Sequence, residues 1–175
     1  MTLECEHVVA DIVAAAGGRL VSRIRLQKLA YLLDQLDQLG AKSGFRYVYC
    51  HYGPYSRDLD AAILDAEAFG LLEEKYHQRE FDGARYSIFE LKGDVASHEF
   101  SYLHKDELRR IVQRLVPVRA TVLELAATAH WIVASEEIQD WTPEIIRRKG
   151  SKTSDGRLAE ATQLLAEIGL PPAVA

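Results

Sequence analysis

The sequence predicts an α+β fold that is mainly helical and contains one short antiparallel sheet. Apolar residues recur every three or four positions along most of the chain, which is typical of amphipathic helices. Between residues 71 and 91 the pattern changes, and two strand-like segments flank Asp82 and Gly83. We therefore expect a winged-helix-like N-terminal unit followed by C-terminal helices.

The first two helices are predicted from apolar stripes that end at glycines. Residues 3–16 place valine, isoleucine and alanine at helical spacing before Gly17 and Gly18. Ser22 is a suitable N-cap for a second helix that runs to about residue 39, where Gly40 occupies the position after the C-cap. The apolar stripe of this second helix consists of Leu26, Leu29, Ala30, Leu32, Leu33 and Leu36.

The middle of the chain is expected to form a strand, a helix and a hairpin. Residues 45–52 have the aromatic and β-branched density of a strand, and Gly53-Pro54 is expected to end it. Ser56 then caps a third helix that stops at Gly70. Two further strands are expected on either side of a tight turn at Asp82-Gly83.

The remainder is expected to be helical. One amphipathic helix ends near Leu115, and Pro117 either begins the next helix at its first position or kinks a continuous one. Residues 118–133 are apolar enough for a buried central helix. Thr142-Pro143 predicts the start of a short helix to about residue 148, and Ser154 or Asp155 is expected to cap a final helix that carries Leu158, Ala161, Leu164, Leu165 and Ile168.

The 175 residues are expected to form a single domain. A possible seam lies near 92–101, between a helix and hairpin unit at 1–91 and a helical unit at 102–170. The only two cysteines, Cys5 and Cys50, do not make a disulfide framework, which favours a reducing cytoplasm. No signal-peptide pattern and no membrane-spanning apolar run is visible in the sequence. We expect a cytoplasmic protein with no membrane partner.

Catalytic and metal-binding motifs are missing from the sequence, so we expect a protein that is not an enzyme and uses no cofactor. Cys50 and His51 are adjacent on a predicted strand, which directs their side chains to opposite faces. Cys5 and His7 diverge on a helix in the same way. His130 lies within an apolar helix, where a core histidine with a hydrogen-bond partner is the favoured interpretation.

A winged helix raises the alternative of a DNA-binding regulator, in which the third helix reads the major groove. The charge of that helix opposes this role, because residues 56–70 carry Arg57 against Asp58, Asp60, Asp65 and Glu67. The net charge of −5 gives no general attraction to phosphate either. Two local basic patches keep nucleic-acid binding open, and their members are Arg19, Arg23, Arg25 and Lys28, then Arg147, Arg148, Lys149, Lys152 and Arg157.

Two motifs stand out, RLQKLAYLLDQL at 25–36 and YCHYGPYSRDLDAAILDAEAFGLLEE at 49–74. Together they resemble the SocA-like antitoxin, or Panacea, domains and the related YwgA-type bacterial proteins. The resemblance implies a small bacterial, non-enzymatic protein that binds another protein, such as a toxin encoded nearby. A homodimer is also compatible with the amphipathic C-terminal helices. The partner-binding residues expected from these motifs are Arg25, Gln27, Lys28, Tyr31, Tyr52, Tyr55 and Arg57.

Overall fold

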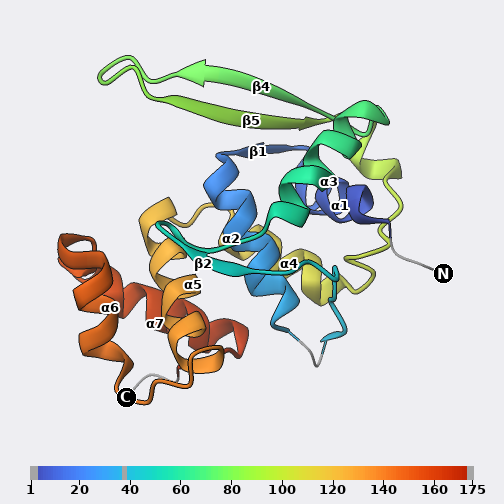
Figure 1. Ribbon diagram of the computed structural model, residues 1–175. Coiled ribbons are helices and arrows are strands. Elements are labelled where there is room, and N and C mark those ends of the chain that lie inside the picture. Colours follow the sequence, from blue (N-terminus) through green and yellow to red (C-terminus); the bar gives the residue numbers. More distant parts are fainter. Residues whose placement is uncertain (1–3, 37–38, 173–175) are drawn as a thin grey trace.

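The computed structural model describes residues 4–36 and 39–172, and it has the mainly helical α+β architecture that the sequence predicts (Figure 1). The N-terminal part contains three helices and an antiparallel sheet of strand order β1-β5-β4. Figure 1 shows the sheet on one side of the helices, with β4 and β5 projecting as a wing. The elements are α1 (Cys5–Ala15), β1 (Arg19–Val21), α2 (Arg23–Asp34), α3 (Arg57–Ala68), β4 (Leu72–Gln78) and β5 (Arg85–Leu91).

Strand β1 and the early end of α2 both differ from the sequence-based prediction. The three residues of β1 carry no strand signal of their own, and β1 forms by pairing with distant β5, where Leu20 lies opposite Phe89. Helix α2 ends at Asp34 rather than near residue 39, and residues 37–38 lie outside the described ranges. The Asp34 carboxylate accepts hydrogen bonds from the Ser43 backbone and the Tyr102 hydroxyl, both 2.8 Å long. These contacts fix the chain that follows the helix.

The aromatic segment forms a short hairpin instead of one strand that ends at Gly53. Strand β2 (Val48–Cys50) pairs antiparallel with β3 (Gly53–Tyr55) around a turn at His51 and Tyr52. The prediction that Gly53-Pro54 ends the strand is therefore wrong. A proline is tolerated here because β3 pairs on one side only, so its missing N–H costs no hydrogen bond within a central strand.

The wing is the predicted hairpin, with a longer turn than expected. The Arg79 N–H donates to the Ala84 carbonyl at 3.0 Å, and the Gly83 N–H donates to the Arg79 carbonyl at 2.8 Å. The turn between Arg79 and Ala84 therefore contains four residues, whereas the sequence indicated a two-residue turn at Asp82-Gly83. Gly83 does adopt the positive φ expected of it, at +69°.

The C-terminal part is helical, as predicted, and three of its helix starts differ in detail. Its helices are α4 (Asp106–Leu115), α5 (Ala120–Ala134), α6 (Trp141–Lys149) and α7 (Arg157–Ile168), with short 3₁₀ turns at Val95–Ser97 and Gly150–Thr153. The helix predicted to start at Thr142-Pro143 begins at Trp141, and Asp140 occupies its N-cap position. Pro117 lies in the connection between α4 and α5, so both roles considered for it are wrong. Gly156, at φ +76°, precedes α7 in place of a Ser154 or Asp155 cap.

One hydrophobic cluster contains buried residues from both sides of the 92–101 segment, including Val9 and Leu29 before it and Leu125 and Leu165 after it. The segment after 92–101 is also tied to α1 through buried Asp11. The Asp11 carboxylate accepts hydrogen bonds from the backbone N–H groups of Tyr102 at 2.7 Å and Leu103 at 3.0 Å.

Within the described ranges, no helix is both long and apolar enough to cross a lipid bilayer.

Candidate partner-binding surface

The β2–β3 hairpin lies against α2 and α5, and close packing at Gly53 sets its position (Figure 1). Gly53 has φ +86°, a conformation that residues with a side chain rarely adopt. A Cβ at this position would lie 2.7 Å from the Thr128 hydroxyl oxygen, which is shorter than a van der Waals contact. Glycine is therefore required both by the backbone conformation and by the distance to α5.

Two buried lysines bind backbone carbonyls of the hairpin. Lys28 Nζ, from α2, donates to the Pro54 carbonyl at 2.6 Å, and Lys149 Nζ, from α6, donates to the His51 carbonyl at 2.9 Å. Lys28 is only 2% exposed, and this burial lowers its pKa to about 8. The ammonium groups satisfy acceptors that the two-stranded ladder leaves unpaired at the end of the hairpin.

Gln27, on α2, binds the residue that connects the hairpin to α3. Its side-chain oxygen accepts from the Ser56 N–H at 2.9 Å, and its side-chain nitrogen donates to the Ser56 carbonyl at 2.8 Å. The Ser56 hydroxyl in turn accepts from the Leu59 N–H at 3.3 Å, which is the N-cap hydrogen bond predicted from the sequence. The hairpin and α3 are therefore held in a fixed relation by one amide side chain.

Glu124 compensates the charge behind the hairpin. Its buried carboxylate accepts from Lys149 at 2.8 Å, and both of its oxygens accept from Lys152 at 2.9 Å. Burial alone would raise the pKa of Glu124, but the hydrogen bonds from the two lysines outweigh it and lower the pKa. A carboxylate that stays ionised here offsets part of the positive charge of three neighbouring lysines.

The aromatic side chains of the hairpin lie against cations of the C-terminal part. The Arg148 guanidinium lies 4.7 Å from the centre of the Tyr49 ring, and Lys152 Nζ lies 5.0 Å from the centre of the Tyr52 ring. Tyr49 also approaches Trp131, with 6.4 Å between the ring centres. Cation–π pairs of this kind contribute about 0.5–1 kcal/mol at exposed sites, so the tyrosines stabilise the hairpin as well as covering it.

The hairpin and the start of α3 carry several accessible side chains, including Cys50 and His51 near the turn. Val48 is 54% exposed, Tyr52 is 46% exposed, Arg57 is exposed and Tyr55 is half-buried. Val48 and Tyr55 lie directly opposite each other in the β2–β3 ladder, so they share one face. The Tyr55 hydroxyl donates to Asp60, which fixes the ring on that face. We call Val48, Tyr52, Tyr55 and Arg57 the hairpin surface.

The other four residues expected to bind a partner are internal, which corrects that part of the sequence-based prediction. Gln27, Lys28 and Tyr31 are almost fully buried. Arg25 is half-buried and donates to the carbonyls of Val116 and Val118, which closes the connection between α4 and α5. In this structure the polar groups of these side chains form hydrogen bonds within the fold.

Tyr31 is paired with a histidine on α5. Its hydroxyl and His130 Nδ1 share a hydrogen bond of 2.8 Å, and both residues are buried. Burial raises the pKa of Tyr31 and lowers that of His130 to about 4. His130 is thus the core histidine with a polar partner that the sequence favoured.

Most of the basic residues considered for nucleic-acid binding face carboxylates, whereas Arg25 and Lys28 bind backbone carbonyls. Arg23 binds Asp60 at 3.0 Å and Glu74 at 2.5 Å, and Arg19 lies 3.8 Å from Glu90. These ion pairs compensate part of the charge of both patches within the protein. In the C-terminal patch the pairs are Arg147 with Glu144, Arg148 with Glu136 and Glu144, Lys149 and Lys152 with Glu124, and Arg157 with Asp155.

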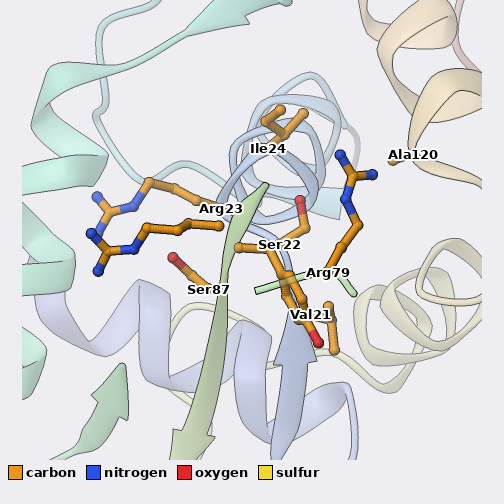
Figure 2. Close-up of a pocket in the computed structure, with 9 residues that line it drawn as sticks. Val21, Ser22, Arg23, Ile24, Arg79, Ser87 and Ala120 are labelled. Atoms are coloured by element: carbon orange, nitrogen blue, oxygen red, sulfur yellow. The ribbon is translucent and has the colours of Figure 1, made fainter. Parts of the chain in front are cut away.

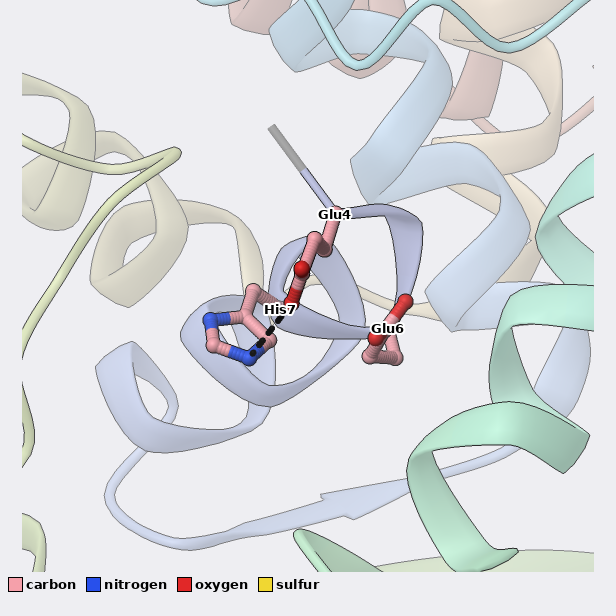
Figure 3. A group of neighbouring side chains, drawn as sticks. All are labelled: Glu4, Glu6 and His7. Carbon is pink, nitrogen blue, oxygen red and sulfur yellow. Dashed lines mark ion pairs between the residues drawn. The ribbon is translucent and has the colours of Figure 1, made fainter. Parts of the chain in front are cut away.

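A small group of metal-binding residue types lies at the start of α1 (Figure 3). Within the part of the chain that the structure describes, the side chains of Glu4, Glu6 and His7 place ligand atoms within 4.8 Å of one another. Glu4 and His7 are largely exposed and form an ion pair of 3.6 Å. Their geometry is not fixed by further contacts to the fold, so we assign no metal to this group.

Sequence reasoning missed Val48, Glu124 and Thr128. Val48 has the side chain of an interior strand residue and becomes exposed because β2 is covered on one face only. Glu124 and Thr128 are polar residues within the apolar helix α5, and a buried polar group usually has a partner. That rule marks both positions as unusual, although it does not identify the hairpin that they contact.

A comparison with protein-family models finds no match to this chain, and a search of curated proteins finds none either. The functional assignment therefore rests on the fold and on the geometry of the hairpin surface.

Proposed function

We propose that this protein is a non-enzymatic binding module that contacts a partner protein through the hairpin surface. The observation that carries the proposal is that a hairpin of two three-residue strands, too small to be stable alone, is held by three buried polar side chains. Lys28 and Lys149 bind carbonyls of the hairpin, and Gln27 binds the backbone of Ser56, the residue that follows β3. The accessible side then presents an aliphatic, two aromatic and one cationic side chain.

The chemistry of this surface suits protein recognition. Tyrosine and arginine are enriched among the residues that dominate binding energy, because they combine a large contact area with polar ends. A rigid hairpin loses little conformational entropy on binding. The SocA-like motifs, which imply a protein partner such as a toxin, include Tyr52, Tyr55 and Arg57 of this surface.

DNA binding is the alternative, and the winged-helix topology favours it. The charge distribution favours it less, because the exposed face of α3 carries Asp65 and Glu67 with no ion-pair partner among the described residues. Two cations that contact α3 are already bound, Arg23 to Asp60 and Arg46 to Asp58 at 3.2 Å, so Arg57 is the exposed cation at its start. Phosphates that approached this helix would meet uncompensated carboxylates.

Capture of the product of the adjacent gene by the purified protein tests the proposal. We expect wild-type protein to retain this product and the double variant Tyr52→Ala/Arg57→Ala to lose at least about 90% of the capture, which corresponds to roughly 1.4 kcal/mol or more. Phe81→Ala, which removes an 82% exposed aromatic side chain from the wing tip, is the matched control and should capture normally. Thermal denaturation confirms that both variants are folded.

Equal capture by the double variant and by wild type would remove the hairpin surface from the proposal. A salt-titrated electrophoretic mobility shift with duplex DNA tests the alternative. A steep fall in affinity with salt, together with a binding defect in Arg57→Ala, would favour DNA as the partner.

A further inference from the structure

A cavity lies under the wing, on the side of the molecule where α2 and α5 begin (Figure 2). Its volume is about 720 Å³, which is within the range of small-molecule sites. The wing contributes one wall, while the end of β1 and the first turn of α2 contribute another. None of the hairpin-surface residues lines this cavity, so it is a separate feature of the fold.

The lining of the cavity is cationic, although the chain carries a net charge of −5. It contains Arg23, Arg79 and Arg85 and no aspartate or glutamate. Arg23 is bound to Asp60 and Glu74, and Figure 2 shows it pointing to the opposite side from Arg79. The charge available to a ligand therefore comes from the two wing arginines.

Arg85 and Arg79 have hydrogen-bond donors to spare. Arg85 lies 5.1 Å from the centre of the Tyr76 ring, and no described carboxylate forms an ion pair with it. Arg79 forms one exposed ion pair of 2.8 Å with Asp82, which uses one nitrogen of a guanidinium that carries five N–H donors. In Figure 2 the Arg79 side chain extends past Ser22 toward Ala120. Arginines of this kind bind phosphate groups through two parallel hydrogen bonds.

The remaining residues that line the cavity are mostly apolar or uncharged. Val21, Ile24 and Ala120 form an apolar wall, and Tyr86 and Ser87 lie on the wing side. The backbone N–H groups of Arg23 and Ile24, at the start of α2, have no acceptor among the described residues and add positive potential. The cavity thus combines an apolar wall with cationic groups.

We propose that this cavity binds a nucleoside polyphosphate. The phosphates contact Arg79 and Arg85, and the base lies against the apolar wall formed by Val21, Ile24 and Ala120. A nucleotide matches the cavity better than a simple anion does, because an anion leaves the apolar wall uncovered. This site is independent of the proposed partner-binding function, and each of the two proposals can fail without the other.

Isothermal titration calorimetry on the full chain tests the site, with nucleoside diphosphates and triphosphates as ligands and pyrophosphate and unphosphorylated nucleosides as comparison. We expect at least one nucleotide to bind about tenfold or more tightly than pyrophosphate, and Arg85→Gln to weaken that binding by about tenfold or more. Arg114→Gln, which removes an exposed arginine on α4, is the matched control and should bind as wild type does. Arg85 is exposed, so the variant is expected to fold, and its melting temperature checks this.

Three results would overturn the proposal. The first is that no nucleotide binds, and the second is that pyrophosphate binds as tightly as the nucleotides do. The third is a single-stranded oligonucleotide that binds more tightly than any nucleotide and is weakened equally by Arg85→Gln and Arg114→Gln, since this pattern indicates a diffuse electrostatic surface.

Discussion

Gly53 and Thr128 approach each other so closely that residue 53 has no room for a side chain. A Cβ there would lie 2.7 Å from the Thr128 hydroxyl oxygen, in a backbone with φ +86°. The hydroxyl itself is buried and has no hydrogen-bond partner among the described residues. Thr128 therefore sets the depth at which the β2–β3 hairpin lies against α5.

Gly53→Ala is expected to lower the free energy of unfolding by about 2–4 kcal/mol. About 1–2 kcal/mol comes from the positive φ and the rest from overpacking against Thr128. Gly83→Ala is the matched control, because Gly83 also has positive φ but its added Cβ would meet nothing within 4 Å. The control should lose only the backbone part, and urea denaturation of both variants measures the difference. Equal losses would show that Thr128 yields without cost.

The double variant Gly53→Ala/Thr128→Ala tests the same contact in the other direction. Removing the hydroxyl costs no hydrogen bond within the described structure, and it opens the space that the new methyl group needs. We expect a coupling energy of about 1 kcal/mol or more in a double-mutant cycle, with the double variant more stable than the sum of the single losses predicts. Strict additivity would contradict the close contact.

Glu124→Gln is expected to destabilise the protein by about 3 kcal/mol. The change leaves the buried Lys149 ammonium, whose side chain is 2% exposed, without its carboxylate. An unpaired buried charge typically costs about 3–5 kcal/mol, and the exposed position of Lys152 reduces its share of the loss. Glu160→Gln, which breaks an exposed pair with Arg119, should cost less than about 1 kcal/mol. Denaturant midpoints compare the two variants, and similar losses would show that the Glu124 pair is not effectively buried.

Local patterns in the sequence predicted most helices and the wing, because each of these elements carries its own apolar periodicity. Strand β1 could not be predicted in this way, since its three residues are ordered by hydrogen bonds to β5, about 70 residues later. The role of Gly53-Pro54 was misjudged for a related reason. A turn-forming dipeptide became a strand because Lys28 and Thr128, from two other helices, hold it there.

The sequence predicted which segment forms the candidate site, but it did not predict which side chains of the motifs are exposed. The YGPYS motif correctly marked the hairpin region, but the spacing in RLQK did not show which of its polar residues face inward. Gln27 and Lys28 are polar residues on the buried side of α2, and the carbonyls and amides that justify their burial lie on β3 and at Ser56. Only the tertiary structure brings these groups together.

Lys28 makes the stability of the protein depend on pH in the alkaline range. Its pKa is about 8 in the folded protein and 10.5 when unfolded, so between these values the unfolded chain holds a proton that the folded chain has released. The free energy of unfolding should therefore rise with pH over this interval, by up to about 3 kcal/mol at its end. Lys28→Met removes this contribution, and denaturation of both proteins between pH 8 and about 9.5 shows the difference. A pH-independent difference would mean that Lys28 stays fully charged when folded.

His130 makes the stability of the protein depend on pH in the acidic range. Burial lowers its pKa from 6.5 to about 4, so below pH 6.5 the unfolded chain gains a proton that the folded chain does not bind. Stability should fall as the pH drops from 6.5 to 4, by up to about 3 kcal/mol from this residue. His130→Gln should lose stability at pH 7, because it disturbs the hydrogen bond to Tyr31, and should then lose less than wild type on acidification. His77→Gln on the exposed wing controls for the loss of one imidazole, and a His130→Gln variant with the acid profile of wild type would place the acid-sensitive group elsewhere.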